Sequence, residues 1–204
     1  MSAPTTPDLL ALDRAAQDLL FRAAHNTFTD EPVTDAKVAA IHDLIRYGPT
    51  AYNGQPLRVL LLRSPAARPT AAVRLQQQPG QDGRRSVDRG PSRRRGLPPT
   101  AARAVSAPSA GAGLAGGRAA RVEQARFNAT LQIGYLIVGV RAAGLAAGPM
   151  AGFDAAGVRR EFFPDGRHEV LLLLNLGHPG REASHERLPR LDTGEVFRTL
   201  DDAG

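Results

Sequence analysis

Apolar residues recur every three or four positions in two N-terminal segments, and this spacing predicts two amphipathic helices. The first helix is expected over residues 8–24 and the second over residues 35–47. Thr34 suits the N-cap of the second helix, because its hydroxyl can accept a hydrogen bond from the first turn. Gly48 can adopt the left-handed conformation that ends many helices, and Pro49 cannot continue one. The second helix is therefore expected to stop before Pro49.

Two continuous apolar runs predict strands. Residues 57–63 are rich in leucine and valine and have the length of a strand. Residues 168–177 contain an unbroken run of five aliphatic side chains, which is typical of a central strand buried on both faces. The two strands lie far apart in the chain, with helices between and around them. This order predicts an α+β fold with a mixed sheet flanked by helices, and the length suits a single domain over residues 1–204.

Further helices are predicted in the second half of the chain. Residues 121–143 form a long helix whose apolar centre is too short to cross a bilayer, so it is expected to be buried, at a subunit interface. Gly144 is expected to end this helix, and the small residues of 145–154 to form a loop. Asp154 suits the cap of a short helix that follows, and Thr193 the cap of a last one.

Residues 65–120 differ in composition from the rest of the chain. They contain seven prolines, eight glycines and ten arginines but no aromatic residue. With two aspartates as the only acids, this segment carries a charge of +8, which exceeds the +6 of the whole chain. Its apolar content is too low to offset the entropy of ordering, so the segment is anomalous and disorder is one expectation for it.

Three interpretations of this segment compete. It is a disordered basic insertion, an arginine-rich arm that binds nucleic acid, or a stretch translated out of frame. Arginine clusters can contact phosphates, but the segment lacks lysine and interleaved aromatic residues, so nucleic-acid binding is disfavoured. Its abrupt edges and its mixture of arginine, proline, glycine and alanine favour a shifted frame in a GC-rich gene.

Composition excludes several chemistries. There is no cysteine, which excludes disulfides, thiolate catalysis and cysteine-bound zinc. The five histidines show no tight metal-ligand spacing, and no metal site is expected. No apolar run is long enough to span a membrane and the N-terminus lacks the pattern of a signal peptide, so a cytoplasmic protein is expected.

Polar side chains gather in residues 47–56, between the second predicted helix and the first predicted strand. Thr50, Asn53 and Gln55 supply hydroxyl and amide groups on a backbone flanked by two prolines. Such a loop suits a flat ligand with polar edges, because its donors are held in place before the ligand arrives. An ordinary helix-to-strand connection is the alternative.

Several motifs, in this order, resemble the flavin-dependent nitroreductase family. They lie at residues 26–33, 47–56, 126–129, 148–154, 175–178 and 187–191. Within that family, the His25-Asn26 pair, the Gly-Pro-Met-Ala-Gly-Phe-Asp loop and the Arg-Leu-Pro-Arg-Leu tail are most similar to the malonic semialdehyde reductase branch. The resemblance covers residues 22–64 and 121–200, and the ordered set is more specific than any one motif.

This resemblance implies an obligate homodimer with FMN at each subunit interface. NADH or NADPH would supply hydride to the flavin, which would pass it to a small-molecule electron acceptor. The isoalloxazine ring carries this chemistry, so no catalytic side chain of the protein itself is expected. The implied reaction is reduction of a small aldehyde such as malonic semialdehyde to the 3-hydroxy acid. Alternatives are a nitroaromatic or quinone reductase on the same scaffold, and an inactive flavin-binding remnant.

The resemblance also implies cofactor-binding residues. Arg22 and Asn26 match positions that reach the FMN phosphate and the pyrimidine edge of the ring, although Ala23 and Ala24 replace family residues that contact phosphate. Arg187 matches a late phosphate-binding arginine, with Arg190 as the alternative. The loop that reaches the flavin from the partner subunit corresponds to Pro49, Thr50, Ala51, Asn53 and Gln55. The loop beside the ring corresponds to Pro149, Met150, Ala151 and Gly152.

The family comparison also bears on residues 65–120. The segment has about the length that the family uses there for helices and a strand, yet the expected pattern is missing. Compensated frameshifts would preserve spacing while changing residues, whereas an insertion would add length. On this hypothesis the protein would lack a central strand and part of the wall around the flavin and substrate.

Overall fold

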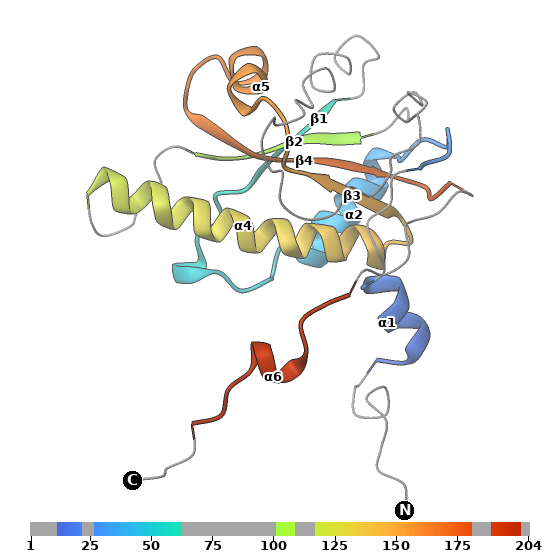
Figure 1. Ribbon diagram of the computed structural model, residues 1–204. Coiled ribbons are helices and arrows are strands. Elements are labelled where there is room, and N and C mark those ends of the chain that lie inside the picture. The colour runs from blue at the N-terminus through green and yellow to red at the C-terminus, as the bar shows by residue number, and fades with distance from the viewer. Residues whose placement is uncertain (1–11, 22–26, 63–100, 109–116, 181–188, 201–204) are drawn as a thin grey trace, which may run out of the picture.

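The computed structural model describes residues 12–21, 27–62, 101–108, 117–180 and 189–200 (Figure 1). A four-stranded sheet lies beside a long helix, and shorter helices surround them. In chain order the elements are α1 (Arg14–Leu20), α2 (Asp35–Ile45), the short 3₁₀ helix η2 (Ala51–Asn53), β1 (Arg58–Leu62), β2 (Ala101–Pro108), α4 (Arg118–Ala142), β3 (Ala146–Met150), α5 (Ala155–Phe162), β4 (His168–Gly177) and α6 (Thr193–Val196).

The strand order is β1-β2-β4-β3, and the three pairings among the described strands are all antiparallel. The α+β architecture is confirmed. The expected mixed sheet is not found within the described residues, where no parallel pair occurs. The connection from β3 to β4 shows why: α5 lies at the end of β3 and returns the chain to the same end of the sheet, so β4 runs back along β3.

Strand β2 lies within the anomalous segment, and it occupies a central position between β1 and β4. The expectation that the chain lacks a central strand is therefore wrong. Pairing uses backbone N–H and C=O groups, so β1 and β4 satisfy their ladders on a segment whose side-chain pattern gives no strand signal. The rest of the anomalous segment, up to Gly117, lies outside the described residues.

Side chains pack on both faces of the sheet. The larger cluster lies between the sheet and helices α2 and α4, where Val140 of α4 and Leu174 of β4 are completely buried. The smaller cluster lies against α5, where Val158 packs with Val170 and Leu173 of β4. Strand β4 contributes to both clusters, which confirms the prediction of a central strand buried on both faces.

A β-bulge interrupts the alternation of side chains along β4. Val105 of β2 pairs with Leu172 and the next residue, Ser106, pairs with Val170, so Leu171 is the extra residue. Leu171 and Leu172 both pack against the larger cluster, while Val170 joins the smaller one. The bulge thus replaces strict alternation with two neighbouring side chains on one face.

Several predicted helix ends are confirmed. Thr34 caps α2 by accepting a hydrogen bond from the Lys37 N–H at 3.2 Å, and Asp154 caps α5 through the Gly157 N–H at 2.9 Å. Gly144, with φ of 77°, follows α4 in the left-handed conformation. Helix α4 begins at Arg118, three residues before its predicted start.

Other predicted boundaries are wrong. Helix α1 begins at Arg14 and not at Asp8, because Asp13 caps it by accepting from the Ala16 N–H at 2.8 Å. Thr193 is the first helical residue of α6, because Asp192 forms a capping box with Glu195.

The expected loop over residues 145–154 is also corrected, since its first half forms β3. Pro149 is tolerated there because β3 is an edge strand with a single neighbour.

Helix α1 packs near the C-terminal end of α4, where the Arg141 guanidinium donates to the Leu20 carbonyl at 2.9 Å. Residues 189–200, which include α6, extend away from the body of the protein (Figure 1). Within the described part of the chain, no helix has the length and apolar character needed to cross a membrane.

Candidate functional site

The α2–β1 loop, residues 46–57, is held in place by one face of α4. Asn128, Gln132 and Tyr135 are four and three residues apart, so they lie on the same side of the helix. The Asn128 side chain accepts from the Ala51 N–H at 2.9 Å and donates to the Ala51 carbonyl at 3.0 Å. The Asn128 side chain is 1% exposed. Among the described residues, it is the only polar side chain that is buried. Both backbone groups of Ala51 therefore bond to a single side chain, and the carbonyl also accepts from the Gly54 N–H at 3.1 Å.

Two further contacts fix the ends of this loop. The Leu57 N–H donates to Gln132 Oε1 at 3.0 Å, and the Tyr135 hydroxyl donates to the Pro49 carbonyl at 2.8 Å. Together with Asn128, these side chains bond the loop at three points along its length. Sequence analysis did not identify them as site residues, although polar side chains on the face of a helix expected to be buried are a signal for such a role.

Close packing against α4 requires glycine at two positions of the loop. A Cβ atom on Gly48 would lie 2.4 Å from the Tyr135 ring, and one on Gly54 would lie 2.7 Å from Asn128 Nδ2. The prediction that Gly48 ends α2 in the left-handed conformation is not borne out, since Gly144 and Gly166 are the described glycines with positive φ. Arg46 ends α2 in a right-handed helical conformation, and Gly48 is needed because the Tyr135 ring fills the space of a side chain.

The Gly48→Ala substitution is expected to lower the free energy of unfolding by about 1–3 kcal/mol, because the ring of Tyr135 must shift to admit a methyl group. A double-mutant cycle with Tyr135→Leu, measured by urea denaturation, checks the cause. The cost of Gly48→Ala should shrink in the Tyr135→Leu background. An equal cost in both backgrounds would show that the ring is not responsible.

The centre of the loop is strained, and one buried polar atom beside it lacks a partner among the described residues. Tyr52 and Asn53 have φ angles of 56° and 53°, a conformation that costs energy for residues other than glycine. The Tyr52 side chain is 86% exposed. The Thr50 hydroxyl is buried and has no hydrogen-bond partner among the described residues. Buried polar atoms of proteins are normally bonded, so this hydroxyl is suited to a ligand.

The other predicted loop lies at the opposite edge of the sheet. Pro149 and Met150 belong to β3, while Ala151 and Gly152 follow the strand and are exposed. Met150 Sδ lies 3.8 Å from the side-chain nitrogen of Asn175 in β4, whose Oδ1 is buried without a partner among the described residues. Sequence analysis did not identify Asn175 as a site residue.

One chain does not bring these two groups together. The start of β1 and the end of β3 lie at the same end of the sheet, but β2 and β4 separate them. Three steps between neighbouring strands amount to about 14 Å. Within one chain the two groups of residues therefore lie apart, at opposite edges of the sheet.

The predicted phosphate-binding residues are mostly beyond the described ranges. Arg22, Asn26 and Arg187 all lie outside the described residues. Arg190 is exposed, donates to the Pro189 carbonyl at 3.1 Å, and lies in the extended tail away from the other candidates (Figure 1). Phe28 forms an isolated bridge with Pro179, which places the segment after Asn26 beside the end of β4.

One ion pair links α4 to the start of β4. The Glu169 carboxylate hydrogen-bonds to the Arg126 guanidinium and raises the pKa of Arg126 above its usual value, so Arg126 stays cationic. The Arg126 side chain is largely exposed, and a pair of this kind contributes less than about 1 kcal/mol to stability.

Comparison with known proteins decides the family. The sequence profile described as the nitroreductase family matches residues 19–178. The chain belongs to the nitroreductase family. This assignment accords with the α+β fold and with the ordered motifs of the sequence.

Relatives of this nitroreductase-family chain align over nearly its full length. A Streptomyces griseus protein provisionally named NADH dehydrogenase/NAD(P)H nitroreductase is 46% identical, covering 94% of this chain and 99% of its own. A protein of the same provisional name from Streptomyces coelicolor is 44% identical with the same coverage. A provisionally named nitroreductase from Exiguobacterium sibiricum, solved in complex with FMN, is similar in fold with a TM-score of 0.70. That structure is 16% identical and covers 93% of this chain and 98% of its own.

Proposed function

We propose that this protein is an FMN-dependent oxidoreductase that takes hydride from NADH or NADPH and reduces a small acceptor. Family membership, the names of the Streptomyces relatives and the FMN complex of the Exiguobacterium protein support this proposal. The observation that carries it is the α2–β1 loop, which α4 holds rigidly while the Thr50 hydroxyl is left buried and unpartnered among the described residues.

The described residues fit a flavin. Thr50, Asn53 and Gln55 would contact it from one chain, since their polar groups lie on a loop fixed before binding. Met150 and Gly152 would lie beside it from the other chain. Bound FMN supplies the redox chemistry, which moves electrons from the nicotinamide to the acceptor. The protein orients the ring, excludes water and places polar groups at its edge.

The flavin site would be shared between two copies of the chain. Its two halves lie at opposite edges of one sheet, so a homodimer can bring the α2–β1 loop of one chain to the β3 end of the other. The extended tail also carries apolar side chains exposed to solvent, which a second copy would cover. These are Leu191, Val196, Phe197 and Leu200.

Malonic semialdehyde is the proposed acceptor, on the strength of the Gly148–Asp154 and Arg187–Leu191 sequence motifs. A nitroaromatic acceptor is the second candidate, because the relatives carry the nitroreductase name. The cytoplasmic location stays a prediction.

The absorbance spectrum of the purified protein tests the proposal. We expect a flavin band that bleaches when NADH or NADPH is added without oxygen, and that returns when the acceptor is added. Malonic semialdehyde, a nitroaromatic and a quinone should be compared as acceptors. A protein that stays colourless after incubation with FMN would contradict the flavin proposal. Flavin that is retained but never reduced would identify an inactive flavin-binding protein.

The frameshift hypothesis for residues 65–120 stays a prediction and has its own test. We expect resequencing of the gene to reveal compensating insertions or deletions at the edges of this segment. An uninterrupted frame with high read support would overturn the hypothesis. Because β2 takes a central place in the sheet, the segment is expected to leave the scaffold able to fold.

A further inference from the structure

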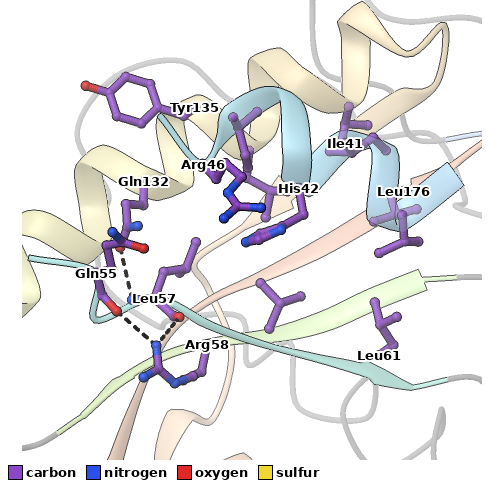
Figure 2. A pocket seen from close by; sticks show the side chains of 15 residues that line it. Ile41, His42, Arg46, Gln55, Leu57, Arg58, Leu61, Gln132, Tyr135 and Leu176 are labelled. Carbon is purple, nitrogen blue, oxygen red and sulfur yellow. Dashed lines mark hydrogen bonds between the residues drawn. The ribbon is translucent and has the colours of Figure 1, made fainter. Parts of the chain in front are cut away.

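A cavity of about 350 Å³ lies between α2, β1 and α4, on the side of the α2–β1 loop (Figure 2). Its volume falls at the lower end of the range for small-molecule pockets, roughly 300–1,000 Å³. The cavity is not lined by the residues of β3 and the following loop that the flavin proposal places beside the ring.

The interior of the cavity is apolar. Its apolar lining comes from three elements: Ile41 and Ile45 of α2, Leu136 and Val140 of α4, and Leu61 of β1. These side chains belong to, or pack against, the larger hydrophobic cluster. The interior therefore suits a hydrocarbon chain or ring.

The mouth of the cavity is polar and basic. His42 and Arg46 of α2 lie on one side, and Arg58 at the start of β1 lies on the other (Figure 2). Gln132 and Tyr135 of α4 complete the rim. No aspartate or glutamate is among the described residues that line this cavity.

Among the described residues at this mouth, Arg58 is the cation with no acidic partner. Its Nη1 donates to the carbonyl oxygens of Gln55 and Leu57 at 2.9 and 2.8 Å, and carbonyls do not neutralise its charge. Its Nε and Nη2 groups have no hydrogen-bond partner among the described residues. By contrast, Arg46 pairs with Asp43 at 3.2 Å. Arg58 thus offers unused donors, in the fork geometry that suits a carboxylate.

We propose that this cavity binds a small monocarboxylate with an apolar chain or ring. The carboxylate pairs with the free donors of Arg58 at the mouth, and the apolar part enters the interior between α2 and α4. The cavity is lined by elements of a single chain, so the site needs neither a second copy nor the β3 half of the proposed flavin site, although it shares Gln55 with the other half.

Octanoate is a suitable probe, and isoleucine methyl groups can report where it binds. The sequence contains four isoleucines. Ile41 and Ile45 line the cavity, whereas Ile133 and Ile137 do not, so the second pair is an internal control. In NMR spectra of the full-length protein labelled at isoleucine δ1 methyls, octanoate should shift the first pair in a saturable manner and leave the second pair in place.

Octanamide has the same chain without the charge, so it separates carboxylate recognition from apolar burial. We expect octanamide to bind about tenfold more weakly than octanoate, because the charge-assisted hydrogen bonds are lost. Equal affinity for the two compounds would overturn the role of Arg58. Shifts of all four isoleucines without saturation would show nonspecific association and overturn the site.

Three variants complete the test. Arg58→Met should weaken octanoate binding about tenfold, while Arg160→Met, which removes an exposed arginine of α5 away from the cavity, should leave it unchanged. Val38 of α2 also lines the cavity, so Val38→Phe should fill it and abolish the octanoate-induced shift of Ile41. Full octanoate binding by Val38→Phe would place the ligand elsewhere and overturn the proposal. The comparison of octanoate with octanamide on the wild-type protein remains decisive if a variant fails to fold.

Discussion

Replacing Asn128 with leucine is expected to lower the free energy of unfolding by about 2–3 kcal/mol, because it leaves the Ala51 N–H without a partner and removes one of the two hydrogen bonds to the Ala51 carbonyl. The amide is nearly completely buried, so water cannot take over either bond. The same change releases the centre of the α2–β1 loop from α4. On the proposed function, the variant should also lose most of its flavin.

Urea denaturation followed by circular dichroism measures the first effect, and flavin absorbance per protomer after desalting measures the second. Thr130→Ala is the matched control, because Thr130 is exposed on the same helix and donates only to the Arg126 carbonyl within α4. It should change stability by less than about 0.5 kcal/mol. Wild-type stability in Asn128→Leu would contradict the anchoring role. Wild-type flavin content in a destabilised variant would show that anchoring and cofactor binding are separate.

Substituting alanine at two glycines of α4 is expected to change the free energy of unfolding in opposite directions. At Gly139 a Cβ atom would lie 2.3 Å from Cγ2 of Ile45, so α2 and α4 must separate or Ile45 must leave its place. Ile45 is β-branched and has few alternative rotamers, so we expect Gly139→Ala to cost about 2 kcal/mol. At Gly134 nothing lies within 4 Å of the added atom, and Gly134→Ala should stabilise the helix by about 1 kcal/mol.

Thermal and urea denaturation of the two variants provide this comparison, in which each glycine serves as the control for the other. The Gly139→Ala defect should be reduced by Ile45→Ala, which removes the Cγ2 atom that the new methyl group would meet. Stabilisation by both alanines would mean that α2 and α4 are not in close contact at Gly139. Destabilisation at Gly134 that depends on protein concentration would place a second copy against that face.

Local patterns predicted the elements that local chemistry controls. The caps at Thr34 and Asp154 depend on hydrogen bonds spanning three residues, and both are confirmed. The glycine after α4 and the bounds of β4 were also predicted correctly, since each follows from a short stretch of sequence. At α6 the prediction missed by one residue, because Asp192 and Thr193 are both good capping residues and Glu195 decides between them.

Elements defined by their neighbours were missed. Strand β2 has little apolar pattern and exists because β1 and β4 pair with it on both sides. Strand β3 contains a glycine and a proline, which are typical of a loop, but its position at the sheet edge tolerates both. Both strands depend on contacts between distant parts of the chain. The periodicity of apolar residues within a segment carries no information about such contacts.

The candidate site likewise combines features that the local sequence predicts with features that depend on distant contacts. The polar α2–β1 loop could be recognised from Thr50, Asn53 and Gln55, because its composition and flanking prolines are local. Its anchor could not, because Asn128 lies 77 residues further along the chain. The separation of the two half-sites follows from strand order, which no single segment encodes. The roles of the residues outside the described ranges stay predictions.

The position of β4 has a consequence for how the chain is made. β4 is the strand that joins β3 to the rest of the sheet, yet it is the last of the four to be synthesised. Residues 109–167 separate β2 from β4, so β2 is synthesised well before the central leucines of its partner. Until then β2 and β3 have no common neighbour and the apolar face of α4 has no sheet to cover. Folding of this sheet is thus tied to the synthesis of β4, and the growing chain depends on protection from aggregation until that point.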